Sequence, residues 1–564
     1  MSLVPPGGAA RAWRTRLEIA ASVALLVVLP LVPGVVASGS VLAFARLPVE
    51  SIVVLLLLAL LPSPSSRLLF AASARGSRDG WAWLRIVLAT AFGLFVCLAI
   101  VLAGIDAGYE AALGIHFVPL DWPQLGDAYG VVAASIGAAP AAAVAVAIVV
   151  VVAAVSAGLA WAALRVDASL RRHAGRGRAA LAAATAAWNA IAAVAPPMGL
   201  ADPPAAAAST GALGSAVSRT VTALQTRELV ARAIADDPFA HADEGQLLTA
   251  LRGKHVVVAF IESYGRVALE DEDISAGVDD VLRRGQEALA ARGYSAQSAW
   301  LTSPTYGGAS WLAHATLQTG IWIDSQTVYS EVVRSDRLTL SAAFAAAGWR
   351  TVSDVPSNTQ DWSVGRDFYR FDTMLDATNV GYRGPSFGYA RIPDQYTWKH
   401  FADQELVDAP RPVMAEIDLV SSHTPWAPLP ELVPWSRIGD GSVYDGQPER
   451  SRSAGAVWED PQTVQRFYGL SIEYALGSMF AFLENVDDPD LVLVALGDHQ
   501  PAAIVSGADA ARDVPITIIA KDPAVFAAIA DWEWEPGPRP GVGSPIWRMD
   551  AFRDRFFTAF GEDR

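Results

Sequence analysis

Five long apolar stretches in the first 200 residues limit what this chain can fold into. Each is roughly 20 residues long, which is the length that a helix needs to cross the hydrocarbon core of a bilayer. They occupy residues 17–37, 41–61, 86–105, 141–164 and 179–195. The second carries Arg46, Pro48 and Glu50 near one end, so we expect it to begin in a kinked or interfacial segment. The fifth is mostly alanine and is the weakest of the five. Residues 1–200 therefore predict an α-helical transmembrane bundle of about five spans.

The positions of arginine and lysine predict how this bundle is oriented, because cytoplasmic loops carry an excess of both. Arginines precede the first span and lie in the loops after the second and the fourth spans, at Arg11, Arg14, Arg16, Arg67, Arg75, Arg78, Arg165, Arg171, Arg172, Arg176 and Arg178. Residues 106–130 contain four acids and no lysine or arginine. The pattern predicts a cytoplasmic N-terminus and an extracytoplasmic location for everything after residue 200. We therefore expect a multi-pass protein of the bacterial cell membrane.

The rest of the chain has a different composition. Residues 201–250 begin rich in Pro and Ala and continue with a helical pattern, which predicts either a linker with a connecting helix along the membrane surface or a helix of the soluble domain itself. Residues 251–564 have a globular mixture with most of the acidic residues. The formal charge of −16 argues against a nucleic-acid partner. Cys97 is the single cysteine, so disulfides within the chain and cysteine-based zinc clusters are excluded.

Apolar strands alternate with helical patterns from residue 251 onward. Strands are expected at 255–261, 349–355, 412–419, 491–496 and 514–519. Helices are expected at 275–292, 339–347, 464–485 and 521–530. This alternation predicts an α/β domain with a central, mostly parallel sheet that is covered on both faces.

Two of these strands end in side chains that bind metals. Glu262 follows the strand 255–261, and the pair Asp498-His499 follows the strand 491–496 after Gly497. Open α/β folds place their chemistry at the carboxyl edge of the sheet. The sequence therefore predicts one metal site, assembled from both strands.

A loop between the strands 255–261 and 349–355 contains a candidate nucleophile. Gly307 and Gly308 permit a tight turn, and Ser310 then falls at the N-cap or in the first turn of a helix over 311–318. The N–H groups at a helix N-terminus suit a phosphate ester on that hydroxyl. The local sequence alone favours the simpler interpretation that Ser310 only caps the helix, and Thr305 is a rival nucleophile in the same loop.

These motifs, in this order, resemble those of the sulfatase/alkaline-phosphatase superfamily and of its membrane-anchored, lipoteichoic acid synthase-like branch of phosphoglycerol transferases. The resemblance rests on Glu262, Ser310 with Gly320 ten residues later, the segment Ser421-Ser-His-Thr-Pro-Trp426, and Gly497-Asp-His499. It implies that Glu262, Ser310, Asp498 and His499 hold a divalent metal. It also implies that Ser310 is the nucleophile and that His423 contacts the substrate phosphate.

The resemblance extends to the substrate site. The segment with Asn358, Trp362 and Arg366 is similar to the tryptophan/arginine segment that binds phosphoglycerol in the family, and Asp394 resembles a recurring acidic position. Mixed oxygen and nitrogen ligands admit Mn²⁺, Zn²⁺ or Mg²⁺, and the branch favours Mn²⁺. No second Asp/His cluster is evident in the sequence, which favours one metal ion over two.

Two departures from the family limit the expected chemistry. Lipoteichoic acid synthases use threonine where this chain has Ser310, and sulfatases that mature their nucleophile need Pro and Arg where Leu312 and His314 stand. We expect a membrane-bound phosphotransferase that moves a phosphoglycerol-type headgroup from a phospholipid donor onto an envelope glycan or lipid through a phospho-serine. The alternatives are a phosphoethanolamine transferase, a sulfatase-like hydrolase or phosphodiesterase that uses water, and a degenerate scaffold that binds envelope polymers without turnover.

Overall fold

The computed structural model describes residues 7–61, 78–124, 138–172, 205–242, 246–507 and 510–562, together with residues 175, 177, 179, 181 and 183–187. They belong to two units. The first comprises Met1–Ala111 and His116–Ala223, and the second comprises Ala112–Ile115 and Leu224–Arg564. Helix α8 (Ala208–Ala235) contributes residues to both units.

The first unit contains long apolar helices. Among the described residues, three helical segments are long and apolar enough to cross a membrane, namely Trp13–Ser38, Trp81–Glu110 and Ala139–Arg172. They are formed by α1 (Gly7–Val28) with η1 (Leu29–Leu31) and α2 (Val32–Ser38), by α4 (Arg78–Leu113), and by α6 (Ala138–Arg172). These helices correspond to the first, third and fourth expected spans.

The expected number of about five spans is not confirmed. The second expected span is interrupted, because η2 (Val41–Ala45) and the short strand β1 (Leu47–Pro48) precede α3 (Val49–Leu60), which has only 12 residues. Pro48 cannot donate a backbone hydrogen bond, which explains why α3 begins after it. Most of the fifth expected span, 179–195, lies outside the described residues.

The helices of the first unit pack around a core of their own. Leu26, Leu58, Phe92 and Leu159 bring α1, α3, α4 and α6 together. Gly93 on α4 lies against α6, where an added Cβ would stand 2.3 Å from the carbonyl oxygen of Ser156. Only a glycine permits this close approach of the two helices.

A nine-stranded sheet forms the centre of the second unit, in the order β10-β4-β9-β8-β3-β7-β5-β6, with β11 paired to β4. The strands are β3 (His255–Ile261), β4 (Ser295–Thr302), β5 (Arg350–Val355), β6 (Thr373–Asp376), β7 (Val413–Leu419), β8 (Leu491–Gly497), β9 (Asp513–Ala520), β10 (Glu535–Pro536) and β11 (Ile546–Arg548). Strands β8, β3, β7, β5 and β6 are parallel, and β9 pairs antiparallel with both β4 and β8. The five expected strands are present as β3, β5, β7, β8 and β9, whereas β4, β6, β10 and β11 were not expected.

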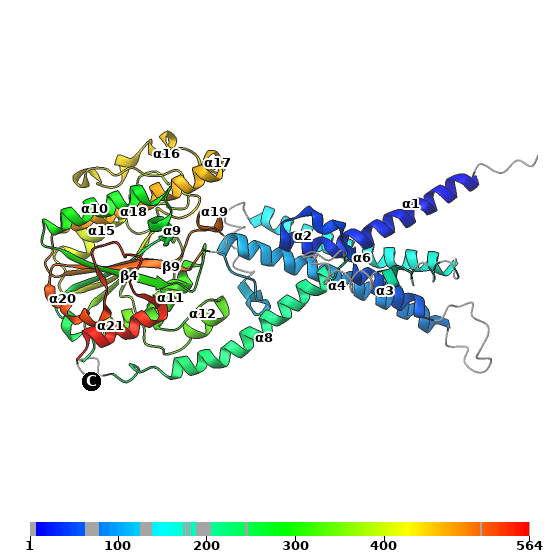
Figure 1. The fold of residues 1–564 in the computed structure, drawn as a ribbon, viewed down its shortest axis with the longest axis horizontal. Coiled ribbons are helices and arrows are strands. Elements are labelled where there is room, and N and C mark those ends of the chain that lie inside the picture. The colour runs from blue at the N-terminus through cyan, green and yellow to red at the C-terminus, as the bar shows by residue number, and fades with distance from the viewer. Residues whose placement is uncertain are drawn as a thin grey trace, which may run out of the picture. The chain divides into compact units, whose positions relative to one another are not determined.

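Helices cover both faces of this sheet (Figure 1). On one face lie α10 (Ser275–Ala290), α15 (Asp394–Phe401) and α18 (Pro461–Val486), and on the other lie α11 (Ser310–Thr319), α13 (Leu340–Ala346), α20 (Pro523–Ala528) and α21 (Phe552–Phe560). The central strand β3 supplies both cores, because Val256, Val258 and Phe260 face one layer and the alternate residues face the other. A strand that is buried on both faces explains the continuous apolar run at 256–261.

Candidate active site

The candidate site lies where three neighbouring parallel strands end. In the register of the sheet, Ile261 at the end of β3 pairs with Gly497 at the end of β8 and with Leu419 at the end of β7. The residues that follow these three strands therefore meet at one edge. They are Glu262 after β3, Asp498 and His499 after β8, and the turn with His423 after β7.

One oxygen of the Asp498 carboxylate is held by the backbone and the other is not. Oδ1 accepts hydrogen bonds from the N–H groups of Ser263 and His499, both at 2.7 Å. Oδ2 is buried and has no hydrogen-bond partner among the described residues. Leaving a buried charged oxygen without a partner is costly, so this atom is suited to a ligand such as a metal ion.

The tautomer of His499 is fixed by a neighbouring carbonyl. Its Nδ1 lies 2.8 Å from the carbonyl oxygen of Gln500, and a carbonyl oxygen only accepts, so Nδ1 carries the hydrogen. Nε2 therefore faces the two carboxylates, with Glu262 Oε1 3.4 Å away and Asp498 Oδ2 3.5 Å away. Glu262, Asp498 and His499 offer ligand atoms that all lie within 4.8 Å of one another.

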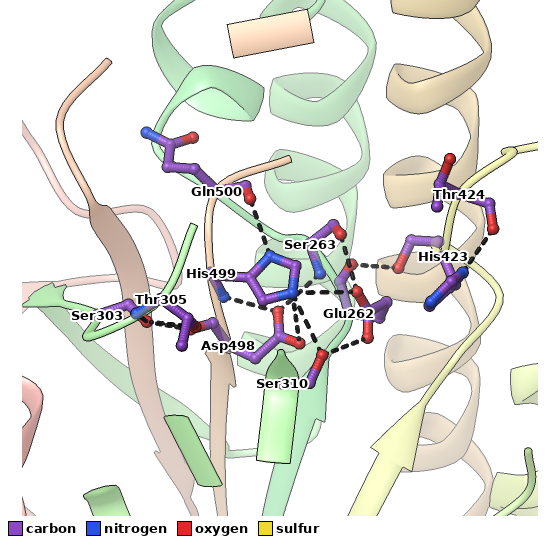
Figure 2. Close-up of polar contacts among 12 residues, drawn as sticks. Glu262, Ser263, Ser303, Thr305, Ser310, His423, Thr424, Asp498, His499 and Gln500 are labelled. Carbon is purple, nitrogen blue, oxygen red and sulfur yellow. Dashed lines mark hydrogen bonds and ion pairs between the residues drawn. The ribbon is translucent and has the colours of Figure 1, made fainter. Parts of the chain in front are cut away.

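Ser310 joins this group from helix α11. The helix begins at Ser310 and follows Ala309, which has a φ of 61°, so the serine occupies the first helical position, as expected. Its hydroxyl donates to Glu262 Oε2 at 3.0 Å and lies 3.2 Å from His499 Nε2 (Figure 2). All four expected metal-binding side chains are thus brought together by the fold.

The electrostatics of the group favour a cation. Burial opposes ionisation of Glu262, but the charges of His423 and His499 and the hydrogen bonds from Ser263 and Ser310 outweigh it and lower its pKa to about 2. Burial and the Glu262 charge raise the pKa of Asp498. Two buried carboxylates that repel each other, an oxygen without a hydrogen-bond partner and an imidazole nitrogen fit a divalent ion with oxygen and nitrogen ligands.

Thr305, the rival nucleophile, lies apart from this group (Figure 2). It is 1% exposed, and its hydroxyl is 3.4 Å from that of Ser303. Ser303 in turn donates to the backbone carbonyl of Asp498 at 2.6 Å. The geometry therefore gives Thr305 a place in the loop that supports Asp498, whereas Ser310 contacts the carboxylate and the imidazole.

His423 lies on the far side of Glu262 from His499, in a turn fixed by several hydrogen bonds (Figure 2). Ser422 donates to the backbone carbonyl of Glu262 at 2.6 Å, and the indole of Trp426 donates to the carbonyl of Ser422 at 2.8 Å. Asp394 is fully buried beneath this turn. The loop after β7 is thus attached to the loop after β3, which holds His423 at the site.

The expected substrate residues Asn358, Trp362 and Arg366 line a cavity of about 150 Å³ at the edge of the sheet near β5 and β6. Arg366 donates to both carboxylate oxygens of Asp361 at 3.0 Å, and Asn358 bonds to the backbone of Gln360. In the described part of the chain, none of their hydrogen bonds or ion pairs reaches Ser310 or His423. The fold brings these three residues to one cavity, without a direct contact to the carboxylate group.

A second group of possible metal ligands corrects the expectation that the chain has none. His314, one helical turn after Ser310 on α11, lies 3.5 Å from Glu416 Oε1 and 3.5 Å from Asp418 Oδ1 on β7. Its ring stacks on Phe260 with centroids 3.7 Å apart. Burial lowers the pKa of His314, but the charges of Asp418 and Glu416 prevail and raise it to about 9. The protonated imidazole offsets part of the negative charge of the two carboxylates, so this group is an ion-pair cluster.

The sequence does contain one sign of this second cluster, the pattern Glu416-Ile-Asp418 in a strand. Residues two apart in a strand face the same side of the sheet, so both carboxylates lie on one face. The partner of the pair, His314, lies about one hundred residues earlier in the chain, and no sequence pattern connects the two.

No family model and no curated protein sequence matches this chain. Among solved structures, it is similar to the lipoteichoic acid synthase LtaP from Listeria monocytogenes, with 14% identity over 58% of this chain and 76% of that chain and a TM-score of 0.35. It is also similar to lipooligosaccharide phosphoethanolamine transferase A from Neisseria meningitidis, an integral membrane protein, with 11% identity over 86% and 90% and a TM-score of 0.42.

A third similar structure is the phosphoglycerol transferase GacH from Streptococcus pyogenes in complex with sn-glycerol-1-phosphate, with 13% identity over 59% of this chain and 91% of that chain and a TM-score of 0.35. Another is described as a protein of the alkaline phosphatase superfamily from Vibrio parahaemolyticus, with 15% identity. These are proteins of the kind that the ordered motifs resemble.

Proposed function

We propose that this chain is a membrane-bound, metal-dependent phosphotransferase of the sulfatase/alkaline-phosphatase superfamily. The observation that carries the proposal is the contact of the Ser310 hydroxyl with Glu262 and His499, beside a buried Asp498 oxygen that has no hydrogen-bond partner. A serine that opens a helix and touches a carboxylate–imidazole group is an activated nucleophile in a setting that binds phosphate.

The proposed metal ligands are Glu262, Asp498 and His499, with Ser310 as the fourth. When bound, a divalent cation there would lower the pKa of the serine hydroxyl and offset negative charge on the phosphoryl oxygens. The carboxylate of Glu262 has a lowered pKa and is a weak base, so it orients the Ser310 hydroxyl rather than removing its proton. The family's preference is the reason that we propose Mn²⁺ first and Zn²⁺ or Mg²⁺ as alternatives.

The chain's own residues carry the transfer. The Ser310 oxygen forms a bond to phosphorus, and the bond from phosphorus to the leaving alcohol of the donor breaks, which gives a phospho-serine. The first turn of α11 would offer backbone N–H groups to the phosphoryl group. His423 is placed to contact the phosphate or the leaving oxygen. A hydroxyl of the acceptor then displaces Ser310 and takes the group.

We propose the donor and the acceptor from the setting of the domain. A unit with long apolar helices favours a phospholipid donor, and the cavity lined by Asn358, Trp362 and Arg366 is suited to a small polar headgroup of the phosphoglycerol type. The acceptor would be a cell-envelope glycan or lipid. A phosphoethanolamine transferase differs only in the headgroup, and a phosphodiesterase differs only in using water, so both are outcomes of the test below.

The full-length protein in vesicles tests this proposal. Vesicles with headgroup-labelled phosphatidylglycerol, phosphatidylethanolamine or phosphatidylcholine are incubated with Mn²⁺, and the release of diacylglycerol is measured. We expect release from phosphatidylglycerol that stops with chelator and in Ser310→Ala. Free glycerol phosphate as the only product would identify a hydrolase, and release from phosphatidylethanolamine alone would identify the other transferase.

A binding scaffold is excluded by turnover of any of these lipids. If neither the wild-type protein nor added metal releases diacylglycerol from any donor, while the protein remains folded and retains metal, the enzymatic proposal is wrong. If the protein does release diacylglycerol, a deletion strain identifies the acceptor, because the envelope precursor that is no longer modified should accumulate.

A further inference from the structure

Tyr389 stacks on His423. The two ring centroids lie 3.6 Å apart, and the ring planes differ by 14°. Tyr389 comes from the loop before α15 and His423 from the loop after β7, so the contact is made entirely by the fold. Tyr389 remains 52% exposed, which leaves much of its ring open to solvent beside the candidate site.

A fixed turn presents Tyr389. The N–H of Phe387 donates to the carbonyl of Ala390 at 3.1 Å, and Gly388 within this turn has a φ of 75°. Phe387 and Ala390 are buried, at 3% and 6% exposure, so the turn is anchored on both sides of the tyrosine. A Cβ on Gly388 would lie 3.7 Å from the carbonyl oxygen of Ala427, which places the turn against the segment after His423.

His423 is constrained on one nitrogen and free on the other. Its Nδ1 lies 2.5 Å from the carbonyl of Thr424, so Nδ1 carries a hydrogen and donates it. Nε2 has no hydrogen-bond partner among the described residues. The Thr424 bond fixes one edge of the imidazole, and the stacked ring of Tyr389 closes one face, so together they define the direction of Nε2.

The direction of Nε2 matters because His423 lies beside the carboxylate group. Burial raises the pKa of Glu262, and the charge of His423 is the largest of the influences that lower it. His423 and Ser310 thus both act on the carboxylate of Glu262, to which the Ser310 hydroxyl donates at 3.0 Å.

The tyrosine hydroxyl points to the second candidate segment. Burial and the charge of Glu262 raise the pKa of Tyr389, and a hydrogen bond with Ser357 partly opposes this rise. Ser357 directly precedes Asn358, which lines the cavity near β5. Tyr389 is thus situated between His423 and the loop that leads to the proposed headgroup cavity.

We propose that Tyr389 is a positioning residue that aims His423 Nε2 at the leaving oxygen of the donor, and this inference rests on the proposed function. Ser310 enters the cycle as its alkoxide, after its proton has passed to solvent. As the Ser310–phosphorus bond forms, the electron pair of the breaking phosphorus–oxygen bond moves to the leaving alcohol. The Nε2 hydrogen of the imidazolium moves to that oxygen, and His423 is left neutral. In the second step the acceptor hydroxyl returns a proton to Nε2 as it attacks the phospho-serine, and Ser310 leaves as the alkoxide, so the cycle closes without another reactant.

A leaving-group comparison tests this role in the full-length protein in detergent. The substrates are phosphatidylglycerol, whose leaving alcohol needs a proton, and glycerol p-nitrophenyl phosphate, whose leaving phenolate does not. The variants are Tyr389→Leu, Tyr389→Phe, His423→Asn and the double variant Tyr389→Leu/His423→Asn. Thermal unfolding of each variant controls for loss of the fold.

General acid catalysis typically contributes 10²- to 10⁴-fold. We therefore expect Tyr389→Leu to lower kcat on the lipid by about 10- to 100-fold, with KM changed less than about threefold. On the p-nitrophenyl substrate the same variant should lose less than about threefold. Tyr389→Phe keeps the stacked ring and should stay within about twofold of wild type. In the double variant, the leucine should add no further loss to that of His423→Asn.

Three results would overturn the inference. They are equal losses on the two substrates, losses that multiply in the double variant, and a Tyr389→Phe variant as impaired as Tyr389→Leu. Failure of the proposed function is recognised separately, because wild type would then show no turnover that depends on Ser310 with either substrate. An enzyme that depends on Ser310 and is indifferent to Tyr389 contradicts the positioning role alone.

Discussion

Asp394 and Ser421 hold each other through two reciprocal hydrogen bonds. The N–H of Ser421 donates to Asp394 Oδ1 at 2.9 Å, and the N–H of Asp394 donates to Ser421 Oγ at 3.0 Å. Asp394 is the first residue of α15, and Ser421 begins the turn that carries His423. The recurring acidic position after the tryptophan/arginine segment thus anchors the histidine loop from behind.

This anchor should make the stability of the protein depend on pH. Burial raises the pKa of Asp394 to about 7, although its hydrogen bonds with Ser421 lower it. The folded state therefore holds a proton that the unfolded state releases near pH 4. As pH rises from about 4 to about 7, stability should fall by a few kcal/mol through this group, and above that range its contribution is constant.

Substitution of Asp394 isolates this effect. Asp394→Asn keeps an acceptor for the Ser421 N–H and cannot ionise, so it should flatten the fall in stability between pH 4 and pH 7. Asp394→Ala loses the acceptor and should destabilise by about 1–3 kcal/mol. Denaturant unfolding at several pH values measures both. If Asp394→Asn shows the same pH dependence of stability as the wild-type protein, that dependence arises from other groups.

The second prediction concerns the nucleophile. Ser310→Ala should lower turnover of a phosphodiester by several orders of magnitude, because it removes the group that forms the covalent intermediate. Ser310→Thr should retain part of the activity, since related enzymes use threonine at this position. Thr305→Ala is the matched control and should reduce activity modestly, through the Ser303 contact that supports Asp498. Mass spectrometry of the trapped intermediate decides, and an adduct on Thr305 would contradict the assignment.

The third prediction concerns the metal. Full-length protein should contain close to one equivalent of a divalent ion, and Asp498→Asn should lose most of it, because a neutral amide replaces the carboxylate whose Oδ2 has no hydrogen-bond partner. His314→Gln, in the neighbouring ion-pair cluster, is the control and should keep the metal. Elemental analysis measures both. Wild-type protein that is active and metal-free in chelator would refute the site.

Topology gives a fourth prediction. The arginines before and between the apolar stretches predict that reporters fused after residue 120 and after residue 210 both lie outside the cytoplasm. Alkaline phosphatase and green fluorescent protein fusions report opposite sides of the membrane. A cytoplasmic location after residue 210 would remove the exported enzyme from consideration.

The carboxylate group could be predicted from sequence because each part follows a recognisable strand. Glu262 and Asp498 end continuous apolar runs, and strands of that kind are buried on both faces and lie at the centre of a sheet. Because neighbouring parallel strands end at the same edge of a sheet, Glu262 and Asp498 are expected to lie close together. Strand β4 (Ser295–Thr302) was not predicted, because it contains serine and glutamine and pairs near the edge, where the apolar pattern is weaker.

Contacts made only by tertiary packing could not be predicted. Tyr389 lies in an irregular loop, and its stack on His423 depends on a turn at Gly388 and on the course of the chain after β7. The second expected span was overestimated for a local reason. Hydropathy averages over Arg46, Pro48 and Glu50, whereas the backbone breaks at Pro48 and leaves a 12-residue helix.

The strand order has a consequence for when the proposed active site can be complete. Asp498 and His499 directly follow strand β8, which is the penultimate long strand to be synthesised and inserts between β3 and β9 near the middle of the sheet. A growing chain therefore carries Glu262 and Ser310 for more than half of the second unit's synthesis without the ligands that would complete them. A chain that stops before Asp498 lacks two of the four proposed ligands, so the proposed chemistry requires β8 to be in place.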